Sequence, residues 1–244
     1  MKRVFWFCLL AVLLPAGAAR AASTVEFTTP AGSRDAIVCQ PEGAGPFPTV
    51  VFNHGSIVDG NGVQGAAQRG YDLAGFCGAL AKEGYLAFLP IRESAPMGNR
   101  FDSYRDDYQA IVAAAVDHVK TRPGADPGRV ALMGFSMGGL TSVIVAPGRT
   151  DLRALVLLAP AFGRGRMEEA AKGIPRLAAP VLLLIEQSDS RPIQRAVGLL
   201  ERELKAHGKE ARVLRYTTGG GHRFFYKVDS FWPDVAAFLR EKMR

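Results

Sequence analysis

Short apolar runs alternate with amphipathic stretches along most of the chain. Strand candidates recur at 48–53, 85–89, 130–133, 154–158, 181–185 and 211–216. Most of these runs have no polar face, which predicts strands that are covered on both sides, as in a parallel sheet. Between them, apolar residues at helical spacing predict helices, with the clearest at 71–83, 103–121 and 231–243. The alternation predicts an α/β fold, in which a mostly parallel sheet has helices on both faces.

The remaining segments refine this picture. Two segments rich in β-branched residues lie between 24 and 40, on either side of a turn at 30–32, and predict an antiparallel strand pair. A glycine-rich stretch at 55–65 predicts a loop. Ser103 is the expected N-cap of the helix that follows it, with Asp106 reaching back to the cap. No repeat, linker or shift in composition divides the chain after residue 21, so we expect a single domain at 22–244.

The first 21 residues read as an export signal. Lys2 and Arg3 precede an apolar run at 4–14, and Ala19-Arg20-Ala21 provides small residues two positions apart. A charged start, a short apolar middle and an A-x-A exit predict a signal peptide at 1–21, cleaved after Ala21. The alternative, a membrane anchor, needs about 20 apolar residues without a break. The run at 4–14 is shorter than that and is followed by Pro15. We therefore expect an exported protein, periplasmic or secreted, with no stable membrane anchor after the signal is removed.

Composition and charge narrow the function. The chain is 48% hydrophobic and 22% charged, as in globular proteins. Its formal charge is +7, but without the three basic residues of the signal, 27 basic residues remain against 23 acidic ones, or +4. With no long run of like charge, nucleic-acid binding is not expected. Cys39 and Cys77 remain in the mature chain, either as a disulfide or as two buried thiols, and no Cys/His cluster predicts a metal.

Ser136 lies where an apolar strand is expected to turn into a helix. It is the centre of Gly134-x-Ser136-x-Gly138, the pattern of a nucleophile elbow. In such a turn the serine hydroxyl projects above the sheet, and the two glycines let strand and helix pass closely. Because a serine hydroxyl is a weak nucleophile, the pattern also requires a base elsewhere in the chain.

His222 is the expected base, because it lies in a glycine-rich loop after the last strand. The carboxyl ends of parallel strands are where ligands bind in such sheets. Asp189, in the loop after the strand at 181–185, is the expected acid that orients the histidine, and Glu186 is the fallback. The resulting order of Ser136, Asp189 and His222 is the order that a nucleophile elbow of this kind requires.

Backbone N–H groups are expected to bind the negatively charged oxygen of the reaction intermediate. One is the N–H of Met137, directly after the serine. The other comes from the loop after Asn53-His54-Gly55, with Ser56 as first choice and Ile57 as second. His54 itself is expected to shape this turn rather than to take part in the chemistry.

Taken together, the chain resembles the α/β-hydrolase superfamily, and within it the dienelactone hydrolase-like branch. The resemblance covers about 49–244 and rests on four segments: Asn53-His54-Gly55-Ser56, Gly134-Phe135-Ser136-Met137-Gly138-Gly139, Asp189 after its strand, and Gly221-His222-Arg223-Phe224. It implies an eight-stranded sheet and hydrolysis of esters or lactones without a cofactor. Dienelactone hydrolases proper use a cysteine nucleophile, so Ser136 implies a serine carboxylesterase instead.

Substrate and alternatives stay open at this stage. We expect a small-molecule ester as substrate, but a peptidase or acyltransferase with the same triad, or a catalytically silent binding protein, remain alternatives. Three arginines after strands are either anion-binding or solvated, namely Arg92, Arg164 and Arg166. Three phenylalanines form either an acyl pocket or core packing, namely Phe135, Phe162 and Phe224. No feature of the sequence indicates an oligomeric state.

Overall fold

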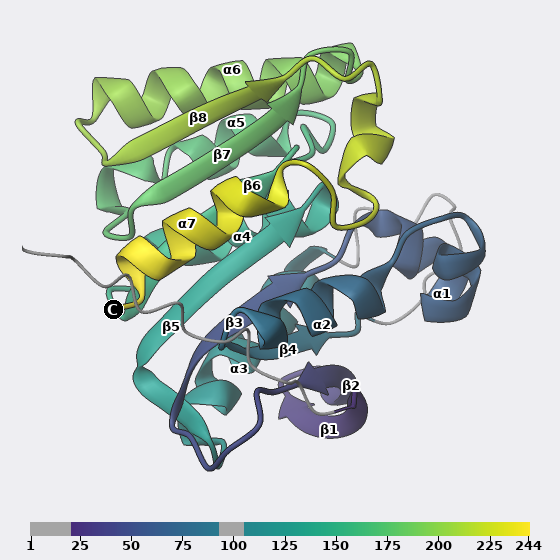
Figure 1. Ribbon diagram of the computed structural model, residues 1–244. Helices are drawn as coiled ribbons and strands as arrows, with labels where there is room; N and C mark the ends of the chain where they lie inside the picture. The colour runs from purple at the N-terminus through teal and green to yellow at the C-terminus, as the bar shows by residue number, and fades with distance from the viewer. Residues whose placement is uncertain (1–20, 93–104) are drawn as a thin grey trace, which may run out of the picture.

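The protein is built on one eight-stranded sheet, seen in a computed structural model that describes residues 21–92 and 105–244 (Figure 1). The strand order is β1-β2-β4-β3-β5-β6-β7-β8. β1 and β2 pair antiparallel, as do β2 and β4, and all other neighbours are parallel. The strands are β1 Ser23–Thr29, β2 Gly32–Cys39, β3 Phe47–Asn53, β4 Leu86–Pro90, β5 Ala125–Phe135, β6 Leu152–Leu158, β7 Val181–Glu186 and β8 Ala211–Tyr216.

Helices cover both faces of this sheet, which confirms the α/β-hydrolase fold expected from the sequence (Figure 1). Helices α3, α4, α5 and α6 pack in succession on one face, and α2 and α7 lie on the other. The helices are α1 Ser56–Gln68, α2 Leu73–Lys82, α3 Arg105–Thr121, α4 Met137–Val145, α5 Arg166–Ala171, α6 Arg191–Ala206 and α7 Trp232–Lys242. Within the two described stretches, no helix is both long enough and apolar enough to cross a membrane.

The core lies between sheet and helices, where the apolar runs of the sequence are found. Every residue of β4 and β7 is buried, and β5 is buried over its last six residues. Such burial on both faces explains why these strands lack an alternating pattern. β5 begins five residues before the expected run, since Ala125 already pairs with Phe47 ahead of a shift in register.

One expected loop is a helix. The glycine-rich stretch at 55–65 mostly belongs to α1, which is interrupted at Gly62 by a left-handed φ of 68°. Glycine lowers helix propensity, so the sequence favours a loop. Burial of Val58 and Ala66, and the ion pair of Asp59 described below, stabilise the helix instead. The expected N-cap Ser103 lies outside the described residues, as does the predicted signal segment except for its last residue.

A disulfide joins Cys39 at the end of β2 to Cys77 in α2. Both residues are buried, and their Cα atoms are 5.5 Å apart. This resolves the alternative left open by the sequence in favour of the bond. The bond closes a loop between positions 38 residues apart and ties the antiparallel edge of the sheet to a helix on its face.

We expect reduction of this bond to lower the free energy of unfolding by about 2–4 kcal/mol, because a cross-link over a loop of this length restricts the unfolded chain. Urea unfolding with and without dithiothreitol measures the loss. A Cys39→Ala, Cys77→Ala double variant provides the control and should be insensitive to reductant. Equal stability of the oxidised and reduced protein would contradict the expectation.

Candidate active site

Ser136 lies on a sharp turn between β5 and α4. Its backbone has a left-handed φ of 52°, which is rare for a residue with a side chain. The turn is held by the end of β6 and the segment after it, because the Ser136 N–H donates to the Leu158 carbonyl at 3.0 Å and the Ser136 carbonyl accepts from the Ala161 N–H at 2.8 Å. The Ser136 side chain is therefore fixed at the carboxyl edge of the sheet, as the elbow pattern predicts.

The two glycines of the motif permit this turn. A Cβ at position 138 would lie 2.1 Å from the Asn53 carbonyl oxygen, and one at position 134 would lie 2.5 Å from the Gly138 carbonyl oxygen. Neither distance is possible for a real side chain. The start of α4 can therefore lie directly against the end of β3.

His222 lies between Ser136 and Asp189. Its Nε2 is 2.8 Å from Ser136 Oγ, and its Nδ1 is 2.7 Å from Asp189 Oδ2. A carboxylate oxygen only accepts, so Nδ1 carries the proton and donates to Asp189. Nε2 of the neutral ring then accepts from the Ser136 hydroxyl. The three residues that the sequence singled out thus form one hydrogen-bonded chain, although they lie 33 to 86 positions apart.

The surroundings hold this chain in place. The Asp189 side chain is fully buried and its Oδ1 accepts from the Ser190 N–H at 2.6 Å. The His222 ring packs on Phe135, with ring centres 4.8 Å apart, and keeps 28% of its side-chain surface exposed. His222 belongs to a short 3-10 turn, η3 Gly221–Phe225, rather than to an open loop. The acid is thus buried, while the base keeps part of its surface exposed.

Glu186, the fallback acid, does not contact His222. Its buried carboxylate accepts instead from the N–H groups of Gly219 and Gly221 and from the backbone and hydroxyl of Ser188. Burial by itself raises the pKa of the Glu186 carboxyl, but these hydrogen bonds outweigh that effect and lower the pKa below its ordinary value. Glu186 is therefore ionised, and its carboxylate accepts hydrogen bonds from the loops that carry Asp189 and His222.

The two expected oxyanion donors lie on adjacent turns. Met137 is the first residue of α4 and Ser56 the first of α1, so neither N–H has an acceptor within its own helix. A Cβ at Gly55 would lie 3.5 Å from Ser136 Cβ, which brings the turn after β3 next to the serine. The structure therefore brings Met137, Ser56 and the serine together at one edge of the sheet.

His54 is buried, and its ring belongs to the frame of this turn. Nε2 accepts from the Arg92 N–H at 3.1 Å, so Nδ1 carries the proton and donates to the Gly55 carbonyl at 3.0 Å. Burial, with the nearby Arg92 charge, holds the pKa of His54 well below its ordinary value. His54 is thus a neutral structural residue, in agreement with the role expected for it.

Arg92 fits neither of the roles suggested for it. It is 1% exposed, and its guanidinium pairs with Asp59 of α1 through two contacts of 3.1 Å and donates to the His54 carbonyl. The charge is thus neither solvated nor committed to a substrate. The sequence missed this pair because Asp59 lies in the stretch that was expected to be a loop.

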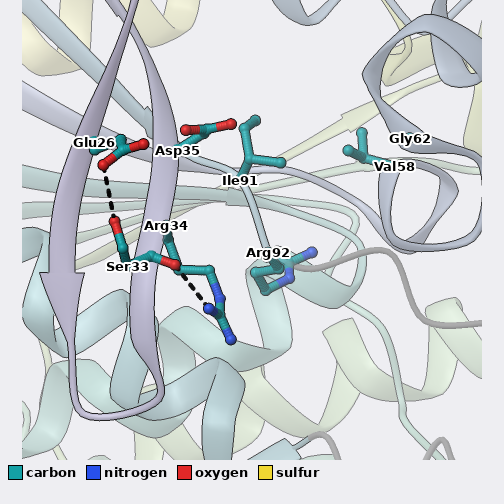
Figure 2. A pocket seen from close by; sticks show the side chains of 8 residues that line it. All are labelled: Glu26, Ser33, Arg34, Asp35, Val58, Gly62, Ile91 and Arg92. Atoms are coloured by element: carbon teal, nitrogen blue, oxygen red, sulfur yellow. Dashed lines mark hydrogen bonds between the residues drawn. The ribbon is translucent and has the colours of Figure 1, made fainter.

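Arg92 also borders a cavity of about 350 Å³ that separates the β1–β2 hairpin from α1 (Figure 2). Glu26 and Asp35 line the hairpin side, and Val58 lines the helix side. None of Ser136, Asp189 and His222 borders this cavity. It is therefore separate from the serine site. Among the described residues, no group of three or more His, Cys, Asp or Glu side chains is arranged to hold a metal ion.

Of the other substrate candidates, the three phenylalanines pack against neighbouring side chains. Phe135 supports His222, and Phe224 packs within an aromatic cluster with Tyr216, Phe225 and Phe231. Phe162 is half-buried beneath the Arg195 guanidinium, at 4.5 Å from its ring centre. Arg164 is exposed, as expected of a solvated charge, and Arg166 begins α5. The structure does not join the three phenylalanines into one acyl pocket.

The neutral state of His54 predicts a pH-dependent stability. Below about pH 6.5 the unfolded chain binds a proton at this residue while the folded protein does not. The free energy of unfolding should therefore fall as the pH drops from 7.5 to 5, with a contribution of up to about 1.4 kcal/mol per pH unit. Urea unfolding across this range measures the slope.

A His54→Gln variant keeps Asp59 and Arg92, so the difference in slope between the two proteins isolates residue 54. The variant should be less stable at pH 7.5 but should depend less on pH. Parallel pH profiles for the variant and the original protein would refute the neutral buried histidine.

Comparison with known proteins identifies the family. The model of the dienelactone hydrolase family matches residues 35–238, and no curated protein matches the chain. A structure named as a candidate dienelactone hydrolase from Klebsiella pneumoniae is 20% identical, with a TM-score of 0.70 over 92% of this chain and 99% of that one. The carboxylesterase EstE1 from a metagenomic library is 22% identical, with a TM-score of 0.69 over 93% of this chain and 91% of its own. The chain belongs to the dienelactone hydrolase family and is a hydrolase of the α/β-hydrolase type.

Proposed function

We propose that the protein is a serine hydrolase that cleaves carboxylic ester or lactone bonds of small substrates through an acyl-enzyme. The observation that carries the proposal is the chain of two hydrogen bonds from Ser136 through His222 to Asp189. The arrangement has a nucleophile, a base within proton-transfer distance and a buried acid that orients the base. No cofactor enters this chemistry.

Acylation begins with attack of Ser136 Oγ on the carbonyl carbon of the substrate. His222 Nε2 takes the hydroxyl proton as the new C–O bond forms. Asp189 accepts the Nδ1–H throughout and stabilises the positive charge on the imidazolium. His222 then gives its proton to the departing alkoxide, so that the alcohol leaves and Ser136 carries the acyl group.

Deacylation repeats these steps with water as the nucleophile. His222 removes a proton from water, the resulting tetrahedral intermediate collapses, and the proton returns to Ser136 while the carboxylic acid departs. In both halves the N–H groups of Met137 and Ser56 are the proposed donors to the charged oxygen. In related enzymes, removal of a single donor of this kind lowers kcat by about 10²- to 10³-fold.

Two alternatives use the same fold. A peptidase or an acyltransferase would keep the triad, and a binding protein would keep only the scaffold. An acylaminoacyl peptidase from Pyrococcus horikoshii shares the fold, but this chain covers only 41% of it. The intact chain of hydrogen bonds favours an active enzyme over a silent scaffold, and the esterases among the solved neighbours agree with an ester substrate.

We expect Ser136→Ala to lower kcat/KM for p-nitrophenyl esters by about 10⁴-fold or more, since the nucleophile is lost. The same change should abolish labelling by a fluorophosphonate. A panel from acetyl to decanoyl esters, with one lactone, measures turnover and chain-length preference together. Ser230→Ala is the matched control, because Ser230 is exposed, and it should keep full activity.

The same panel separates the alternatives when a peptide anilide and an acceptor alcohol are added. An esterase turns over the esters far faster than the anilide and releases free acid. Unchanged turnover in Ser136→Ala would eliminate the serine mechanism. Absence of fluorophosphonate labelling in the original protein would favour the silent scaffold.

We also propose that the protein is exported after cleavage behind Ala21, which leaves one domain at 22–244. The buried Cys39–Cys77 disulfide supports this, because such bonds persist in oxidising compartments. Expression of the full chain in a bacterium, followed by fractionation and intact mass measurement, should yield a periplasmic or secreted protein that begins at Ala22. A full-length cytoplasmic product would contradict export.

A further inference from the structure

Glu186 stands at the end of β7, directly beneath the two loops that carry the acid and the base. It is fully buried, and burying a charge is costly unless donors replace the lost water. The mechanism proposed above gives it no step. A buried carboxylate at this place therefore requires another explanation.

The donors that reach Glu186 come from both loops. From the acid loop, the Ser188 N–H donates to Oε2 at 2.7 Å, and the Ser188 hydroxyl donates to the same oxygen. From the histidine loop, the Gly219 N–H donates to Oε1 at 2.9 Å and the Gly221 N–H to Oε2 at 3.1 Å. One carboxylate thus holds together two segments that lie more than 30 positions apart.

These donors are next to the reacting residues in the chain. Ser188 precedes Asp189, and Gly221 precedes His222. The Gly221 N–H also donates to Ser188 Oγ at 3.1 Å, so the two loops touch directly. The Glu186 carbonyl in addition accepts from the Asp189 N–H at 3.0 Å. A shift of the carboxylate would therefore move the acid and the base relative to each other.

We propose that Glu186 is a positioning residue that fixes the spacing of Asp189 and His222 by clamping their loops together. This inference rests on the proposed function of the triad. The clamp needs an acceptor-only group, because three N–H groups and one O–H point at it. A carboxylate satisfies all of these donors, whereas an amide would direct its own N–H₂ at one of them.

The size of the effect follows from the geometry of proton transfer. The Ser136–His222 and His222–Asp189 contacts are 2.8 and 2.7 Å, and a displacement of about 1 Å in such a site costs on the order of 10²-fold in rate. Loosened loops would misplace the base without altering where a substrate binds. The loss should therefore appear in kcat and leave KM nearly unchanged.

The first test is Glu186→Gln, assayed on p-nitrophenyl acetate. We expect kcat to fall by about 10- to 100-fold, with KM changed by less than about threefold. Ser188→Ala removes only the bridging hydroxyl, so it guards against a folding failure of the first variant, and it should lower kcat by about 2- to 12-fold. Asp151→Asn is the matched control, because it also changes a carboxylate to an amide and weakens ion pairs, here with Arg149 and Lys120. Asp151 directly precedes β6, so it lies at the amino ends of the strands, away from the triad.

A double-mutant cycle tests whether Glu186 acts through the histidine. In a His222→Ala background, the further change Glu186→Gln should alter the residual rate by less than about twofold. The same fold loss in both backgrounds would overturn the proposal, because Glu186 would then act on stability alone. Full activity of Glu186→Gln would overturn it as well.

A spectroscopic readout does not depend on turnover. The His222 Nδ1 proton, held by Asp189, should give a downfield proton resonance that His222→Ala removes. We expect Glu186→Gln to broaden or abolish this signal and Asp151→Asn to retain it. An unchanged signal in Glu186→Gln overturns the clamp, whether or not the protein cleaves esters. If the original protein neither cleaves esters nor reacts with the fluorophosphonate, the proposed function is overturned but the clamp is not.

Discussion

The contact between Gly138 and the Asn53 carbonyl determines where the serine stands. Because position 138 has no side chain, the first turn of α4 can approach the end of β3 to a distance that any Cβ would prevent. The chain then has only one residue, Ser136, in which to turn from strand to helix, and that residue takes a left-handed φ. Such a conformation costs about 1–3 kcal/mol and persists only where neighbours enforce it. Here Leu158 at the end of β6 and Ala161, three residues later, enforce it through backbone hydrogen bonds.

Two buried carboxylates, Asp59 and Glu186, support segments next to the serine. Their negative charges are compensated by different kinds of partner. Asp59 faces the Arg92 guanidinium and steadies the turn that carries Ser56, yet burial still raises its pKa above the ordinary value. Glu186 faces only N–H and O–H donors in the contacts described above, and its pKa is lowered. Hydrogen bonds from backbone groups and one hydroxyl thus stabilise the charge of Glu186, whereas Asp59 relies on the Arg92 cation.

Local patterns in the sequence were sufficient for most of the fold and for selecting the three residues that the structure joins by hydrogen bonds, Ser136, His222 and Asp189. The apolar runs of β4, β6 and β7 and the glycine spacing around Ser136 are local signals, and the positions of Asp189 and His222 follow from strand order. The roles of Arg92 and Glu186 did not follow, because no sequence motif marks their partners, which lie about 33 positions away. The helix α1 was missed for the same reason, since its glycines favour a loop while its stabilising contacts are distant.

The segment at 219–221 illustrates how tertiary contacts reverse a local expectation. Three consecutive glycines suggest a mobile loop that swings the histidine over the sheet. In the fold, Gly219 and Gly221 have left-handed φ values of 78° and 53°, which a side chain would rarely allow, and this conformation turns their N–H groups toward Glu186. The residues that give the unfolded chain its freedom are therefore the ones that permit two backbone donors to converge on one carboxylate. Precision in the placement of His222 arises from that convergence, and neither the glycines nor the carboxylate would provide it alone.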